Sequence, residues 1–173
     1  MSKTYKIAFA AVLVALGVIL TRFLGITTEI IYIGIGELPI YLAGILLGPI
    51  WGFCTGALVD VVGHFLKPMG AYFPGFTLGS GLIGLLAGLF LYKNRSLNIW
   101  KITLTVAAAQ ILNSLILTPL WLSILYKKGF WLFIPGRLLE QGFLLVVYPL
   151  LLFVLVKALR KLPLQSSLNQ KPL

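Results

Sequence analysis

Apolar runs alternate along the chain with short clusters of charged residues, proline and glycine. Breaking the sequence at these clusters leaves six apolar segments, at residues 5–24, 37–47, 49–65, 71–92, 102–126 and 135–159. The runs are longer and more continuous than barrel strands, which alternate over about ten residues. Helices that satisfy their own backbone hydrogen bonds are therefore expected. The pattern predicts an all-α integral membrane protein with six transmembrane helices, forming a single transmembrane domain over residues 1–173.

The second and third segments are the least regular part of this pattern. A helix needs about 20 residues to cross a hydrocarbon layer of roughly 30 Å. Segments 37–47 and 49–65 together hold too many residues for one span and barely enough for two, and Gly48-Pro49 between them is a turn signal. Five helices plus one re-entrant segment is therefore an alternative to six spans.

The composition agrees with a chain that stays in the membrane. Apolar residues make up 60% of the 173 and charged residues 10%, which is more apolar side chain than one soluble core can bury. The start resembles a signal peptide, but no small-x-small cleavage site follows, so it is interpreted as a retained first helix. The single cysteine, Cys54, excludes an intrachain disulfide and is expected to be a small buried residue.

The basic residues divide unevenly between the two sides that six spans define. Nine of the 14 Lys and Arg fall on the side of the termini, so both termini are expected in the cytoplasm and the protein in the cell membrane. All four acids, Glu29, Glu37, Asp60 and Glu140, fall on or near the outer side. The net charge of +10 then reflects topology and anionic lipid, and no nucleic-acid partner is expected.

Motifs for ATP hydrolysis, metal chemistry and acyl transfer are missing from the sequence. It has no Gly-x-x-x-x-Gly-Lys-Ser/Thr loop, no His-Glu-x-x-His, no Gly-x-Ser-x-Gly and no acid cluster for Mg²⁺. No catalytic residue, metal site or cofactor is therefore predicted, and the chain is not expected to be an enzyme. It also lacks a convincing internal repeat of the kind found in secondary transporters.

Small residues recur at helical spacing. Glycines every fourth residue from Gly44 to Gly56 predict close helix packing within the monomer. In the first helix, Ala8, Ala11 and Ala15 form a stripe of small residues near the cytoplasmic end. This stripe is a candidate docking face for another membrane protein.

Charged and amide side chains inside or near the spans are costly to insert and are candidates for function. Arg22 ends the first helix, and Asp60 lies near the outer end of the third. Arg137, Glu140 and Gln141 share one helix face because they are three and four residues apart. Snorkelling basic residues and a structural Arg137–Glu140 ion pair are the alternative. Two amides of the fifth segment, Gln110 and Asn113, are more typical of interhelical hydrogen bonds than of ligand contacts.

The stretch GHFLKPMGAYFPGFTLGSG, residues 63–81, interrupts the apolar pattern on the outer side. Its histidine, His64, has no second ligand at metal spacing, so it is interpreted as a bystander. Lys67 stands close to Tyr72, Phe73 and Phe76. Aromatic residues at this position form an interfacial belt or, together with a basic residue, contact a flat anionic heteroaromatic ligand.

These residues, and above all LGPIWGFCTGALVDVVGHFLKPMGAYFPGFTLGSGLIGLLAG, resemble the substrate-binding S components of energy-coupling factor (ECF) vitamin transporters, specifically the folate family. YFPGFTL is the most specific piece. The resemblance implies a protein that binds a vitamin from outside and associates with a transmembrane coupling subunit and two ABC-type ATPase subunits. It also implies an Ala-x-x-x-Ala dock, which corresponds here to Ala11 and Ala15, with Ala8 one turn earlier.

The resemblance further implies a ligand pocket on the outer side, closed by loops 25–36 and 64–71. Arg22, Lys67 and Arg137 are the candidates for the two carboxylates of folate. Tyr72, Phe73 and Phe76 would flank its rings, and Asp60, Glu140 or Gln141 would pair with the donor edge of the pterin. The alternatives are an S component for pantothenate, riboflavin or thiamine and, from another class, a stand-alone membrane enzyme or channel.

Overall fold

The computed structural model describes residues 3–27, 32–68, 70–94 and 98–161. Helices and a minimal strand pair follow one another as α1 (Lys3–Arg22), β1 (Ile26–Thr27), β2 (Tyr32–Ile33), α2 (Leu38–Leu47), α3 (Pro49–Leu66), α4 (Pro74–Leu91), α5 (Ile99–Gln110), the π-helix η1 (Ile111–Leu117), α6 (Thr118–Tyr126), the 3₁₀-helix η2 (Phe130–Phe133) and α7 (Ile134–Lys161). The two strands pair antiparallel, with Ile26 opposite Ile33. All six predicted apolar segments are therefore helical.

Five of these helical stretches have the length and apolarity to cross a membrane: Lys3–Arg22, Pro49–Leu66, Pro74–Leu91, Ile99–Tyr126 and Glu140–Leu159. The remaining predicted span, the second one at residues 37–47, forms the ten-residue helix α2. Ten residues rise about 15 Å, half of the hydrocarbon layer. Because Gly48 turns the chain with φ +107° between α2 and α3, α2 reaches only partway across. The cytoplasmic position of the termini stays a prediction.

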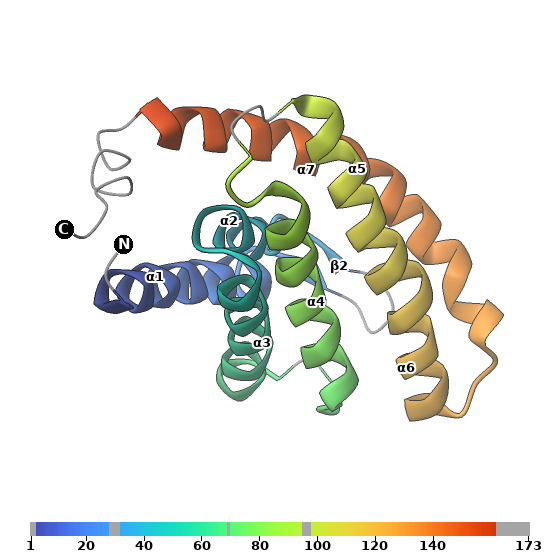
Figure 1. Ribbon diagram of the computed structural model, residues 1–173. Helices are drawn as coiled ribbons and strands as arrows, with labels where there is room; N and C mark the ends of the chain where they lie inside the picture. The colour runs from blue at the N-terminus through green and yellow to red at the C-terminus, as the bar shows by residue number, and fades with distance from the viewer. Residues whose placement is uncertain (1–2, 28–31, 69, 95–97, 162–173) are drawn as a thin grey trace.

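The helices pack in two groups (Figure 1). Helices α3 and α4 lie side by side, with α1 and α2 against them. On the other side of α4, α5 continues through η1 into α6 as one long rod, and α7 packs along α5. Buried apolar residues between the groups, including Tyr41, Ile83, Val106 and Tyr148, form the core. Tyr148 also donates a hydrogen bond of 2.8 Å to the carbonyl oxygen of Gly34, before α2.

Glycines let the backbones of α2, α3 and α4 touch. A Cβ atom added at Gly52 would overlap the carbonyl oxygen of Gly84, and one added at Gly56 would overlap that of Ser80. A Cβ at Gly44 would reach the backbone of Gly84 as well. The predicted role of these glycines in helix packing is therefore confirmed.

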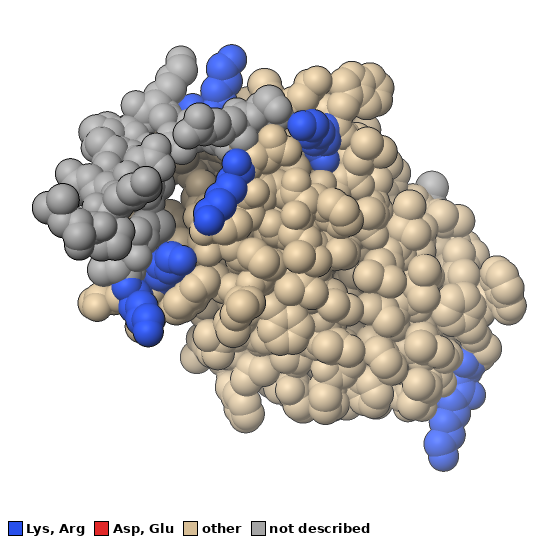
Figure 2. Space-filling view, viewed as in Figure 1, with Lys and Arg blue, Asp and Glu red and all other residues tan. Residues whose placement is uncertain are grey.

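The surface of the bundle is apolar around its middle. Figure 2 shows basic side chains toward the left and upper left, around the start of α1 and the connection from α4 to α5 in the same view, and at the lower right, with uncharged surface between them. Large apolar side chains such as Leu104 and Val146 are exposed on the outside of the bundle, as expected for a surface that faces lipid. Cys54 is exposed on α3, so its prediction as a buried residue is wrong: lipid can cover an apolar side chain without burial in protein. Three charged residues used in the side count, Glu29, Arg95 and Lys171, lie outside the described residues.

We expect Gly52→Ala to lower the thermal unfolding temperature of the detergent-purified protein. The added methyl group forces the backbones of α3 and α4 apart, and overpacking of this kind costs about 1–3 kcal/mol. Gly142→Ala is the matched control, because a Cβ at Gly142 in α7 meets no atom within 4 Å. That substitution should leave the unfolding temperature unchanged or raise it slightly. Equal unfolding temperatures for the two variants would contradict the close packing.

Candidate ligand-binding site

A cavity of about 240 Å³ lies between the two groups of helices. Its walls come from the end of α1, the start of α2, α3, the connection from α3 to α4, α4, η1, α6 and the first turns of α7. Eight of the nine predicted ligand-binding residues line it: Arg22, Asp60, Tyr72, Phe73, Phe76, Arg137, Glu140 and Gln141. The structure thus brings together residues that are up to 119 positions apart in the sequence, from Arg22 to Gln141. Their contact with a ligand stays a prediction.

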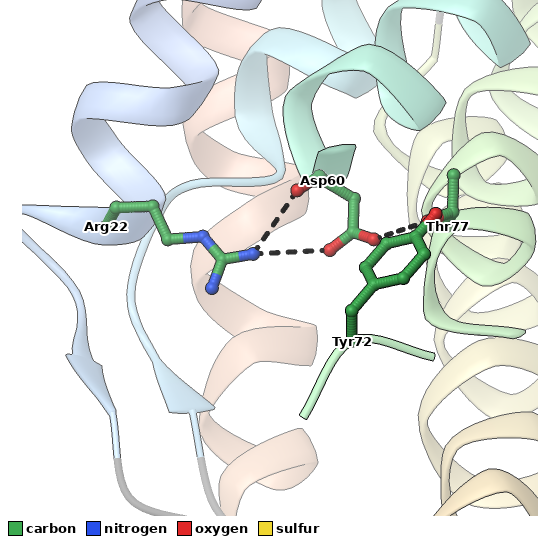
Figure 3. Close-up of polar contacts among 4 residues, drawn as sticks. All are labelled: Arg22, Asp60, Tyr72 and Thr77. Atoms are coloured by element: carbon green, nitrogen blue, oxygen red, sulfur yellow. Dashed lines mark hydrogen bonds and ion pairs between the residues drawn. The ribbon is translucent and has the colours of Figure 1, made fainter. Parts of the chain in front are cut away.

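One wall is a chain of polar contacts across three helices (Figure 3). The Arg22 guanidinium at the end of α1 lies 3.3 Å from one carboxylate oxygen of Asp60 on α3. Thr77 on α4 donates a hydrogen bond of 2.7 Å to the other oxygen, and the Tyr72 hydroxyl lies 3.1 Å from the Thr77 hydroxyl. Gly63 makes room for this arrangement, because a Cβ there would come within 2.7 Å of Arg22 Nε. The carboxylate of Asp60 therefore has partners on both sides.

Aromatic rings line the cavity beside this wall. Phe73 packs against Phe76 at 6.0 Å and against Trp121 of α6 at 5.6 Å between ring centroids. His64 also lines the cavity, with its ring 5.1 Å from that of Tyr72. The structure therefore adds His64 to the residues that line the cavity, and its interpretation as a bystander in ligand binding stays a prediction. Its position one helical turn after Asp60 on α3 is the signal that predicts this place.

A hydrogen-bonded group of side chains forms the opposite wall. The Ser114 hydroxyl oxygen accepts hydrogen bonds from Arg137 at 3.1 Å and from Gln141 at 2.6 Å. Ser114 and Asn113 lie in the π-helix η1 and both line the cavity. π-helical segments are rare in proteins, and those that occur are often found at functional sites. The shared face predicted for residues 137, 140 and 141 is confirmed, since all three reach this cavity.

Glu37 is a cavity residue that sequence reasoning did not include among the ligand contacts. It immediately precedes α2 and accepts a hydrogen bond of 2.7 Å from the buried side chain of Gln110 on α5. The expectation that Gln110 makes an interhelical hydrogen bond is thereby confirmed. Asn113, Ser114 and Thr118 were likewise missed as cavity residues. Their signal is a run of small polar residues in an otherwise apolar segment.

Two predicted groups lie away from the cavity lining. Lys67 is exposed at the end of α3, with its ammonium 5.5 Å from the centre of the Phe23 ring. Ala8, Ala11 and Ala15 are all exposed along α1, so the stripe is open on this chain. Among the described residues, no three His, Cys, Asp or Glu side chains gather in a way that could hold a metal ion.

The helical fold and its polar cavity are those of a transporter binding subunit. Over residues 1–161 the chain matches the family described as "ECF-type riboflavin transporter, S component". The chain belongs to this family of membrane transporter S components, and the resemblance to its folate-family members is confirmed. The class is not one of enzymes.

Relatives within this class carry a folate name. "Folate transporter FolT" of Clostridium novyi (strain NT) is 30% identical over 167 residues, which cover 96% of each chain. "Folate transporter FolT" of Leuconostoc mesenteroides is 25% identical over 152 residues, 85% of this chain and 80% of that relative. The solved structure "Crystal structure of FolT bound with folic acid" superposes with a TM-score of 0.81 at 33% identity, covering 88% of this chain and 92% of the other.

We expect Asp60→Asn to destabilise the ligand-free protein strongly, because it leaves the Arg22 guanidinium buried without its counter-charge. Removing one partner of a buried ion pair costs about 3–5 kcal/mol, whereas replacing both partners with apolar residues is often nearly neutral. The double variant Arg22→Met with Asp60→Leu should therefore unfold closer to the wild-type temperature than Asp60→Asn does. Lys67→Met removes an exposed charge and serves as the control. If Asp60→Asn lowered the unfolding temperature no more than this control, the ion pair would not contribute to the stability of the protein.

Proposed function

We propose that the chain is a folate-binding S component that takes the vitamin into the cavity between the two helix groups. The observation that supports this most directly is the composition of the cavity. Arg22 and Arg137, the rings of Tyr72, Phe73 and Phe76, and three acidic side chains meet in one space. Folic acid offers matching chemistry, with two carboxylates, flat rings and a ring edge of N–H donors. The similarity to a FolT structure bound with folic acid agrees with this choice.

The size of the cavity suggests how the ligand lies. Pockets for drug-sized ligands measure about 300–1,000 Å³, and this one is smaller, at about 240 Å³. We infer that the flat rings occupy the cavity and that the glutamate tail lies toward the end formed by the α3–α4 connection, the end of α6 and the start of α7, which we call the mouth. Arg137 is three residues into α7, near the end that faces the mouth, and its guanidinium could pair there with a carboxylate.

Riboflavin is the second candidate, because the matching family is described by that vitamin. Riboflavin also has flat rings but carries no charge. Three carboxylates line the same cavity as the two arginines, and Arg22 is already paired with Asp60, so the charge of the cavity does not choose between the two vitamins. The folate names of the relatives and the FolT structure bound with folic acid favour folate.

We further propose that transport depends on partner subunits: a transmembrane coupling protein and two ABC-type ATPases in the plasma membrane. The chain has no nucleotide-binding loop of its own. It exposes a stripe of three alanines on α1, and stripes of small residues let helices approach closely in membranes. On this view the chain binds the vitamin, and ATP hydrolysis by the partners drives its release inward.

Titration of the detergent-purified protein with four vitamins tests the binding proposal. We expect saturable 1:1 binding of folic acid, followed by the fluorescence of its tryptophans, and weaker binding of riboflavin, pantothenate and thiamine by a factor of about ten or more. The reason is that charge-assisted hydrogen bonds to the carboxylates are available to folic acid and absent for riboflavin. Tighter binding of riboflavin than of folic acid would overturn the choice of ligand and leave the class intact.

Ala11→Leu tests the docking stripe. We expect this variant to bind folic acid as the wild type does and to lose most uptake in cells or liposomes that contain the coupling and ATPase subunits. The control is Leu16→Phe, an exposed position about 140° away around α1, which should leave uptake unchanged. Loss of binding together with uptake, or equal uptake by both variants, would count against a dock on this face.

A further inference from the structure

We propose that Glu37, held in place by Gln110, determines specificity by accepting the two adjacent N–H donors of a 2-amino-4-oxo-pyrimidine ring, the terminal ring of folic acid. This inference rests on the proposed function and assigns the floor of the same cavity. It differs from the expectation that Asp60, Glu140 or Gln141 binds that edge.

The side chain of Glu37 bonds across the bundle rather than to the helix that follows it. It makes no cap bond to the first turn of α2. Its carboxylate instead accepts a hydrogen bond from Gln110, 73 residues away on α5. Gln110 is 2% exposed, so its amide is fixed by packing. The carboxylate is thereby pinned on the cavity wall with acceptor capacity to spare.

The lengths of the helices place Glu37, which Gln110 holds by its hydrogen bond, at the end of the cavity away from the mouth, which we call the floor. Glu37 precedes the ten residues of α2 and so lies about 15 Å from the turn at Gly48, and Gln110 follows the start of α5 by about 16 Å. The turn at Gly48 lies against the ring of Tyr92, at the end of α4, and α5 begins a few residues later along the chain. By contrast, Arg137 and Glu140 are in the first two turns of α7, which begins at the opposite end. A ring that enters from the mouth therefore reaches Glu37 last.

The other acids of the cavity are less suited to this role. The two carboxylate oxygens of Asp60 already face Arg22 and Thr77. Glu140 stands one turn from Arg137 on the same face of α7, closer to the mouth. The Glu37 carboxylate accepts a single hydrogen bond from the described part of the chain. Arg137 also acts on it electrostatically, and its oxygens retain room for further hydrogen-bond donors.

The ring edge supplies such donors. The 2-amino group and the ring N3–H of a 2-amino-4-oxo-pyrimidine point the same way and are spaced like the two oxygens of a carboxylate. Sites built to hydrogen-bond a ligand N–H discriminate strongly against an analogue that lacks it, because their buried polar groups are then left unpaired. Gln110 is not itself a lining residue of the cavity, so its role is to hold the Glu37 carboxylate in place.

Calorimetric titration of the full-length protein with folic acid and with its 2-desamino analogue tests the proposal. Wild type should bind the analogue about 10- to 100-fold more weakly, as expected for losing a hydrogen bond to a charged acceptor. Glu37→Gln turns an amide N–H₂ toward the ring donors and should weaken folic acid by a similar factor while leaving the analogue nearly unchanged. Gln110→Met should reduce the preference for folic acid over the analogue by a smaller factor than Glu37→Gln does. The double variant should show the same preference as Glu37→Gln alone, because Gln110 acts through Glu37.

Glu140→Gln is the matched control and should change the affinity for both ligands by the same factor. Equal affinity of wild type for the two ligands, or selectivity lost through Glu140 rather than Glu37, overturns this inference without touching folate binding. A wild type that binds neither ligand overturns the proposed function and this inference with it. The comparison of ligands on the wild type requires no substitution, so a variant that fails to fold does not remove the test.

Discussion

Charged side chains meet at one cavity in a mostly apolar bundle: Arg22 and Glu140 are buried, and Glu37, Asp60 and Arg137 are half-buried. A buried charge without partners costs several kcal/mol, so each of these groups needs an opposite charge or hydrogen bonds from protein or ligand. Asp60 obtains them from Arg22 and Thr77. Glu37 has one amide donor. The wall at Asp60 has its hydrogen-bond and charge partners within the protein, and it is therefore structural. The floor at Glu37 has fewer hydrogen-bond donors, and it is therefore the part suited to a ligand.

The close packing of one helix group makes room for this polar space in a small protein. Glycines bring α2, α3 and α4 into backbone contact, so these helices need little side-chain volume between them. The second group, α5 to α7, meets the first through a core that includes Tyr41 and Tyr148. Polar side chains collect on the other side of that contact. Because α2 spans only part of the membrane, Glu37, the residue immediately before it, brings a carboxylate to the interior rather than to the surface.

Periodicity and composition predicted the helical segments well, because a membrane helix needs a long apolar run and leaves few alternatives. They also placed Arg137, Glu140 and Gln141 on one face, since that spacing is local. The features that the sequence did not predict are contacts between residues far apart along the chain. No local pattern shows that Gln110 meets Glu37 or that Ser114 accepts hydrogen bonds from two residues of α7. The exposure of Lys67 depends on how α3 ends, and the length of α2 depends on the turn at Gly48.

The fold of this family does not by itself determine which vitamin a member binds. The family is described by riboflavin, while similar chains are named for folate. Helix packing through Gly52 and Gly84 depends on backbone contacts that no ligand touches, and it can be shared among proteins for different vitamins. Specificity must come from the few polar groups that line the cavity. Riboflavin offers one ring N–H between two carbonyl groups, whereas folic acid offers two neighbouring donors. A fixed carboxylate at the floor distinguishes these edges, because it attracts the two donors and repels the flanking carbonyl oxygens.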